Sequence, residues 1–176
     1  MYVIELIELT AGILAYMAGY VSYCEKNIAA TALCALCSAF LLLRACRDIR
    51  MGRYLHMPMK KVDKLSGRAF EEYLSVQFKH LGYRVKSTGA SYDFGADLIL
   101  KKHGEKIVVQ AKRYDRSVGI SAVQEAAAAI AYYEADKAMV VSNRNFTKSA
   151  RDLARQNEVE LWGREEIEKK FHIREL

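Results

Sequence analysis

Residues 93–113 read DFGADLILKKHGEKIVVQAKR, and this stretch decides the fold. It holds two runs rich in Ile, Leu and Val, residues 97–102 and 105–113, with only His103-Gly104 between them. Apolar runs on both sides of so short a turn predict two antiparallel strands joined as a hairpin. The other elements of the domain can be placed by working outward from this hairpin.

The turn also predicts which positions of the hairpin lie opposite each other. A hairpin centred between His103 and Gly104 pairs positions whose numbers add to 207, which sets Asp97 opposite Gln110. Directly opposed side chains share one face of a sheet, with Cβ atoms about 4.5–5.5 Å apart. Lys112 emerges on the same face, because side chains alternate along a strand. The other face presents an apolar row: Leu98, Leu100, Ile107, Val109 and Ala111.

A carboxylate, an amide oxygen and an ammonium group therefore converge at one end of the hairpin, which suits hydrolysis of a phosphodiester. Mg²⁺ takes oxygen ligands, and Asp97, Gln110 and the backbone carbonyl of Ala111 can supply them. Such a metal acidifies a bound water and neutralises charge that develops on the phosphate. Lys112 can orient the water or stabilise the pentavalent phosphate. Glu71, in the first turns of a predicted helix, can reach the metal directly or through water. Taken singly, an Asp at a strand start is usually a turn former and a Lys on a strand is usually solvated.

The elements around the hairpin alternate between helix and strand. Ser66 is a good helix cap, the helix after it has one apolar face, and Gly82 ends it. The expected order is a helix at 66–81, strands at 83–86, 97–102 and 105–113, a helix at 121–135, a strand at 138–142, a helix from Thr147, a strand at 159–162 and a helix at 164–171. The sequence therefore predicts an α/β domain of order αβββαβαβα.

The N-terminal third differs sharply, because its charged side chains up to residue 43 are only Glu5, Glu8, Glu25 and Lys26. Residues 4–23 approach the length of about 20 residues that a spanning helix needs, and residues 28–43 are somewhat shorter. The short connection between them requires the two to run antiparallel. We therefore expect residues 1–46 to form a two-helix transmembrane hairpin. A soluble helical hairpin buried against a partner is the alternative, since Glu5 and Glu8 weaken the first stretch.

A basic segment follows, with seven Lys or Arg against two Asp between residues 44 and 64. Positive residues stay on the cytoplasmic side of a membrane, so both chain ends are expected in the cytoplasm. This places the protein in the inner (cytoplasmic) membrane as a multi-pass protein, with residues 47–64 as a basic juxtamembrane linker and 65–176 as a cytoplasmic domain. All four cysteines lie between residues 24 and 46, so the C-terminal domain encodes neither a disulfide scaffold nor a zinc site.

Four stretches of the C-terminal domain resemble the Mrr-type restriction endonuclease domain, a branch of the PD-(D/E)xK nuclease superfamily. They are Ala69-Phe70-Glu71, Gly82-Tyr83-Arg84-Val85, residues 93–99 and Val109-Gln110-Ala111-Lys112-Arg113-Tyr114. The resemblance continues through Val141-Ser142-Asn143, Phe146-Thr147, Ala150 and Leu161-Trp162, and it covers roughly residues 65–165.

The resemblance implies a restriction-endonuclease-like αβββαβ core with a mixed central sheet, and a Mg²⁺-dependent endonuclease, with Mn²⁺ as a substitute metal. It assigns the metal-binding Asp to Asp97, the Q-x-K pair to Gln110 and Lys112, and the helix Glu to Glu71. Gln in place of Glu leaves one negative charge fewer, which predicts modest metal affinity. Phe94 replaces a glycine often found there, which predicts a narrower approach to the site. Superfamily members that cut both strands usually dimerise, which leaves a homodimer open, although no surface in the sequence identifies itself as the dimer interface.

Basic residues gather around the predicted site, and DNA, double-stranded and in some cases modified, is the expected partner. The residues expected to bind nucleic acid are Lys86, Arg113, Arg116 and Gln124. Gln124 either faces the site or lies elsewhere on its helix, where it is packed or exposed to solvent. Phosphate binding by such groups would depend strongly on salt. A Gly-rich phosphate loop is absent from the sequence, so nucleotide-driven translocation is not encoded here.

Three functions remain open on the sequence alone. The first is a membrane-anchored endonuclease for DNA that restricts foreign DNA. The second is a membrane-tethered module that binds nucleic acid with a nuclease fold and little or no cleavage. The third is an interaction protein whose N-terminal hairpin docks a membrane partner. The intact trio of Asp97, Gln110 and Lys112 favours the first.

Overall fold

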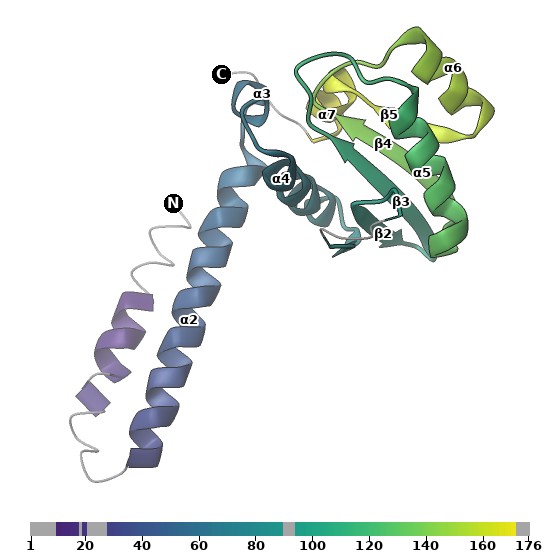
Figure 1. The fold of residues 1–176 in the computed structure, drawn as a ribbon. Coiled ribbons are helices and arrows are strands. Elements are labelled where there is room, and N and C mark those ends of the chain that lie inside the picture. The colour runs from purple at the N-terminus through teal and green to yellow at the C-terminus, as the bar shows by residue number, and fades with distance from the viewer. Residues whose placement is uncertain (1–9, 18, 21–27, 90–93, 172–176) are drawn as a thin grey trace. The chain divides into compact units, whose positions relative to one another are not determined.

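The structure, a computed structural model, describes residues 10–17, 19–20, 28–89 and 94–171 (Figure 1). The chain divides into two compact units, Met1–Arg53 and Tyr54–Leu176. The second unit contains the sheet and the residues predicted to carry the chemistry, so the two units are described separately.

The first unit is helical where the structure describes it. Residues 10–17 are helical, and the long helix α2 (Ile28–Leu55) begins where the second apolar stretch was expected. Among the described residues, no helix combines the length and apolar character needed to cross a membrane. The predicted connection at residues 24–27 and much of the first predicted span lie outside the described residues. The transmembrane hairpin therefore stays a prediction.

The predicted linker, residues 47–64, is helical over much of its length. α2 continues through its first part to Leu55, and Pro58 caps the short helix α3 (Met59–Val62). Proline suits this position, because it lacks a backbone N–H and the helix needs none from the residue just before its first turn. Met59 and Val62 are fully buried in the core of the second unit. The C-terminal end of this segment is therefore packed in the core of the C-terminal domain, which the many charged residues of the segment did not indicate.

A five-stranded mixed sheet of order β1-β2-β3-β4-β5 forms the centre of the second unit. The strands are β1 (Arg84–Ser87), β2 (Leu98–Lys102), β3 (Glu105–Lys112), β4 (Lys137–Ser142) and β5 (Val159–Trp162). β1, β2 and β3 pair antiparallel, whereas β3, β4 and β5 pair parallel. Leu98 faces Val109 and Lys102 faces Glu105, so the predicted hairpin register is confirmed. The α/β class and the mixed sheet are confirmed with it.

One face of the sheet packs against α4 (Gly67–His80), whose N-cap Ser66 accepts a hydrogen bond from the backbone N–H of Ala69. The predicted apolar row of the hairpin lies on this face, with Ala111 at its margin. α7 (Arg164–Lys170) adds Ile167 to the same core. Aromatic side chains fill much of this side: Phe70, Tyr73, Phe78, Trp162 and Phe171.

The other face packs against α5 (Ile120–Tyr133) and α6 (Lys148–Gln156) (Figure 1). Its core consists mostly of alanine and valine, among them Val108 and Val140 from the sheet and Ala122, Ala126 and Ala129 from α5. α5 packs on β3 and β4. Since Gln110 and Lys112 alternate with the residues of the α4 face, they lie on the α5 face with Val108.

Candidate active site

Asp97 and Gln110 meet at the end of the β2–β3 hairpin that lies away from its turn. The Asp97 carboxylate oxygen Oδ2 accepts hydrogen bonds from Gln110 Nε2 and from the backbone N–H of Ala111, each at 2.7 Å. The backbone N–H of Asp97 donates to the Val109 carbonyl at 2.9 Å, which continues the strand pairing past Leu98. The predicted convergence of this carboxylate and this amide is therefore present in the structure.

The turn that delivers Asp97 to the sheet has an unusual backbone. Phe94 and Gly95 both have positive φ, at 44° and 85°. A Cβ on Gly95 would lie within 3.0 Å of both the carbonyl carbon and the carbonyl oxygen of Glu125 on α5. Only glycine allows this approach, so α5 sits directly against the turn. Thr88 holds the other side, because its backbone N–H donates to the Asp97 carbonyl at 3.1 Å.

Lys112 lies on the same face and forms an ion pair with Glu125, with 2.7 Å between Nζ and Oε2. The lysine side chain is only 18% exposed. Burial disfavours the ammonium form, but the hydrogen bond and charge of Glu125 outweigh this, and the pKa of Lys112 is raised above its ordinary value. Asp97 contributes to the same shift through its charge. Lys112 is therefore a cation at neutral pH, on the same face of the sheet as the Asp97 carboxylate.

The donor set fits a hard metal ion. Gln110 is 5% exposed, and its amide oxygen Oε1 is buried with no hydrogen-bond partner among the residues that the structure describes. A buried carbonyl oxygen without a partner is costly, and Mg²⁺ is a ligand for oxygens of this kind. Within the described part of the chain, no three His, Cys, Asp or Glu side chains gather to hold a metal. A metal here would therefore need the mixed set of Asp97, Gln110 and the Ala111 carbonyl.

Glu71 lies on α4 and is half-buried. α4 covers the Leu98 face of the sheet, whereas Asp97, Gln110 and Lys112 lie on the opposite face. A carboxylate on α4 reaches the site only around the end of the hairpin. The role predicted for Glu71 stays a prediction.

The residues expected to bind nucleic acid are dispersed. Lys86 is exposed on β1, and Arg116 is exposed after β3. Arg113 is engaged internally, since its Nε donates to the Leu65 carbonyl at 2.6 Å and its Nη1 pairs with Asp115 at 2.7 Å. Gln124 lines a surface hollow between α5 and α6, beside Ile120 and Leu153 and not beside Lys112. Of the two sequence expectations for Gln124, the structure matches exposure away from the site.

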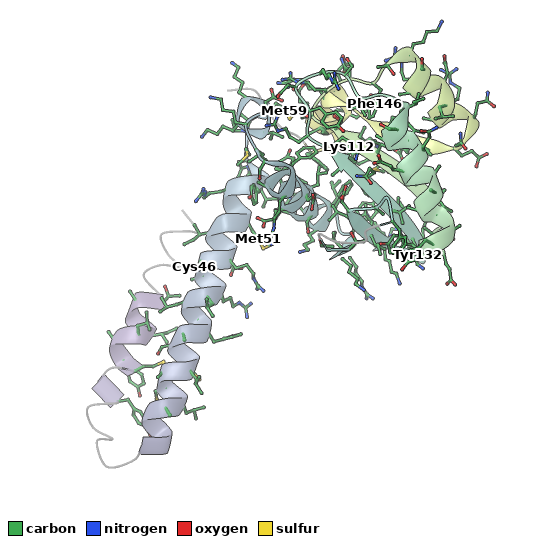
Figure 2. All side chains as sticks on the ribbon, in the orientation of Figure 1. Cys46, Met51, Met59, Lys112, Tyr132 and Phe146 are labelled. Atoms are coloured by element: carbon green, nitrogen blue, oxygen red, sulfur yellow. The ribbon has the colours of Figure 1, made fainter. Side chains whose placement is uncertain are left out.

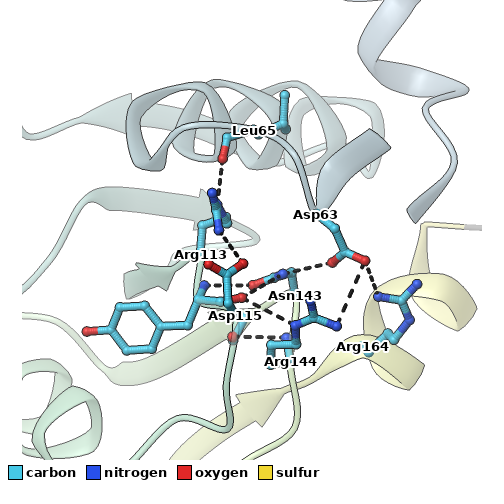
Figure 3. A network of polar contacts seen from close by, with 9 residues as sticks. Asp63, Leu65, Arg113, Asp115, Asn143, Arg144 and Arg164 are labelled. Carbon is cyan, nitrogen blue, oxygen red and sulfur yellow. Dashed lines mark hydrogen bonds and ion pairs between the residues drawn. The ribbon is translucent and has the colours of Figure 1, made fainter. Parts of the chain in front are cut away.

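A polar network holds the loop that follows Lys112 (Figure 3). The buried Asn143 side chain accepts from the Tyr114 backbone N–H at 2.9 Å and donates to the Tyr114 carbonyl at 3.0 Å. Asn143 also donates to Asp63 at 2.8 Å, and Arg164 pairs with the same carboxylate at 2.9 Å. Burial raises the pKa of Asp63, but the hydrogen bonds from Asn143 and Arg164 outweigh it and leave the pKa lowered.

Sequence reasoning missed two residues of this region. Glu125 was passed over for its neighbour Gln124, because the phase of an alanine-rich helix does not reveal which side faces the sheet. Asn143 was noted only as part of the resemblance. A buried asparagine directly after an apolar strand was the available signal, since such a side chain usually hydrogen-bonds backbone groups of a neighbouring loop.

The fold and the site together define a restriction-endonuclease-like nuclease, in which a carboxylate, an amide and a lysine meet on one face of a mixed sheet. The family model Mrr_cat, described as restriction endonuclease, matches residues 62–170, and the chain belongs to this family. A solved structure described as that of a protein of unknown function, AF1548, is similar over 53% of this chain and 55% of that one, with a TM-score of 0.47 and 14% sequence identity. No curated protein matches the chain.

Proposed function

We propose that the domain at residues 62–170 is a Mg²⁺-dependent endonuclease that hydrolyses DNA phosphodiester bonds in a restriction-like role. The observation that supports it most is the meeting of Asp97, Gln110 and Lys112 on one face of the sheet, in a member of the restriction endonuclease family. Mn²⁺ is expected to substitute for Mg²⁺, because both accept oxygen ligands.

Each residue has a distinct part in this proposal. Asp97 and Gln110 would hold the metal, with the Ala111 carbonyl as a third oxygen. When bound, the metal supplies a more acidic water and neutralises negative charge on the phosphate. Lys112, as a largely buried cation, would stabilise the charge that grows on the phosphate oxygens during attack. The hydrogen bonds from Gln110 and Ala111 hold the Asp97 carboxylate in a fixed orientation before the substrate arrives.

The test is cleavage of supercoiled plasmid by the full-length chain, with Mg²⁺, with Mn²⁺ and with EDTA. Lys112→Ala should lower cleavage by about 100- to 1,000-fold, as for the loss of one group that stabilises transition-state charge. Lys148→Ala is the matched control, because it removes an exposed lysine of α6, a helix that packs on α5 and β5. Binding of plasmid without cleavage, with methylated and unmethylated DNA alike, would favour the binding module over the enzyme.

We further propose that residues 1–46 attach this nuclease to the cytoplasmic membrane, with the nuclease domain in the cytoplasm. The support is the sequence alone: two apolar stretches, a four-residue connection and the basic segment from Arg44 to Lys64. Fractionation of cells that express the full-length chain tests it. Retention of the protein in the membrane pellet after carbonate washing is the expected result, and release into the supernatant contradicts it.

A further inference from the structure

α5 packs mainly on β3 and β4, so among the described residues no helix makes extensive contact with the part of the α5 face that β1 and β2 form. The side chains there include Arg84, Lys86 and Lys101, all exposed, while Ile99 between them is half-buried. We refer to Arg84, Lys86 and Lys101 as the β1–β2 basic patch.

The strand register places like charges directly opposite each other in this patch. Arg84 pairs with Lys101, and Lys101 pairs with Lys106, so three cations form one row across β1, β2 and β3. Like charges at directly opposed positions destabilise a sheet. Lys106 is compensated, because its Nζ donates to the Tyr133 carbonyl at 2.7 Å, at the negative C-terminal end of α5. Arg84 and Lys101 have no acidic partner among the described residues.

A sheet that keeps an uncompensated row of cations on an open face is suited to bind anions. A surface hollow of about 370 Å³ lies at the hairpin-turn end of the row and is lined by Arg84, Lys101, His103 and, from the other face of the sheet, Lys102. Every charged or ionisable group in this lining is basic. The partner that fits is therefore a chain of phosphates.

The patch lies on the same face as the candidate active site. Lys86 pairs with Ile99, two residues along the strands from the cation row, and Asp97 lies two residues further in the same direction. Asp97 and Lys101 are four residues apart, or roughly 14 Å at 3.4 Å per residue. A DNA strand advances about 3.4 Å along the helix axis per nucleotide, so this separation corresponds to about four nucleotides.

An exposed aromatic pair lies at the C-terminal end of α5, where Lys106 of the cation row is also held. Phe94 stacks on Tyr132, with ring centroids 3.8 Å apart, and their exposures are 49% and 57%. Tyr132 precedes Tyr133, whose carbonyl receives Lys106, and it lies towards the opposite end of α5 from Lys112 (Figure 2). Phe94 keeps a positive φ, a conformation that is strained for a bulky residue. Basic groups beside exposed rings are typical of surfaces that bind nucleic acid.

We propose that the β1–β2 basic patch binds the phosphates of the DNA strand about four nucleotides from the bond that is cut. The proposal rests on the proposed function, because the distance of about four nucleotides is counted from the phosphodiester bound at Asp97. The phosphates are those of DNA and not of a lipid surface, because the patch and the active site lie on one continuous face of the sheet.

The experiment measures binding of a fluorescent DNA duplex by the full-length chain in EDTA, at several salt concentrations, for two triple variants. The patch variant is Arg84→Gln, Lys86→Gln, Lys101→Gln. The control variant is Lys79→Gln, Lys148→Gln, Lys169→Gln, which removes the same net charge from exposed positions on three helices. Each lost phosphate contact lowers the slope of log affinity against log salt by about 0.9. The patch variant should therefore lose about 2–3 units of slope, and the control should keep the slope of the unmodified chain.

Two further measurements make the outcomes separable. Thermal unfolding should show the patch variant at least as stable as the unmodified chain, because it lacks the opposed like charges. Binding to vesicles of anionic phospholipid should be the same for the patch and control variants.

Equal salt slopes for both variants, with plasmid cleavage intact, would overturn the proposed role of the patch and leave the proposed endonuclease activity standing. Weaker vesicle binding with unchanged DNA binding would assign the patch to lipid and overturn the proposal. An unmodified chain that neither binds nor cuts DNA would reject the proposed function together with it.

Discussion

The two faces of the sheet are built from side chains of very different size. The α4 face holds a cluster of rings, in which Phe78 contacts Tyr83, Trp162 and Phe171 with centroids 5.4–5.7 Å apart. The α5 face is lined mostly by alanine and valine. Large rings fill the space between sheet and helix and stabilise the domain, whereas small side chains let α5 approach. The close approach of α5 brings Glu125 to Lys112, so the face with the weaker hydrophobic packing carries the chemistry.

The largest expected effect is on the ring side. Phe78→Ala should destabilise the domain by about 3–5 kcal/mol, because it removes a fully buried ring from the centre of the cluster. Urea unfolding followed by circular dichroism measures it. Phe94→Ala is the matched control, since that ring is exposed and its one described stacking partner is Tyr132, so about 1.5 kcal/mol is the upper expectation. Equal losses for the two rings would show that the α4 face does not hold the domain together.

The next effect is on the small-residue side and concerns the approach of α5. Gly95→Ala should cost about 1–3 kcal/mol more than Gly104→Ala, because both glycines have positive φ but only Gly95 lies against the Glu125 backbone. A Cβ at Gly104 meets nothing within 4 Å among the described atoms. Urea unfolding of the two variants gives the difference, and the backbone strain that they share cancels. Identical losses would mean that α5 does not need the glycine.

The contrast between the two faces of the sheet also explains how much of the molecule could be predicted from the sequence. The hairpin register followed from two turn residues and alternating side chains, which are local properties, and with it came the meeting of Asp97 and Gln110. The rotation of α5 about its own axis could not be predicted in this way. Alanines such as Ala127 and Ala128 spread apolar side chains over most of the helix surface, so no single apolar face marks the side that packs on the sheet. Glu125 was therefore missed. Likewise, the burial of Met59 and Val62 depends on rings far along the chain, and the charges around them indicated a basic juxtamembrane linker.

A smaller effect is expected where the segment before α4 joins the loop after β3. Asp63→Asn should destabilise the domain by about 1–2 kcal/mol at neutral pH, since it weakens the bonds to Asn143 and Arg164. The pKa of Asp63 is lowered on folding, so its contribution is fully present above the unfolded value of about 3.9. It is lost as the pH falls through the lowered folded value.

Urea unfolding of Asp63→Asn and of the unmodified domain across acidic pH checks both the size and the sign. The gap in the free energy of unfolding between the two should narrow below about pH 4. A gap that stays constant down to low pH would show that the charge of Asp63 contributes little, and that packing of Met59 and Val62 alone holds the segment. Glu165→Gln, at an exposed acidic position on α7, is the control and should show no comparable gap.

The smallest effect on stability is expected at Glu125, and it separates folding from chemistry. Its side chain is 43% exposed, so Glu125→Gln should change the free energy of unfolding by less than about 1 kcal/mol. On the proposed endonuclease, however, it releases the ammonium group of Lys112 from its fixed position. Misplacing a catalytic group can cost up to about 100-fold in rate, so kcat for cleavage should fall while KM for DNA stays the same. Gln124→Ala, one residue away and turned towards α6, should leave both constants unchanged. If Glu125→Gln cleaves like the unmodified chain, the sheet alone positions Lys112, and the close approach of α5 serves packing only.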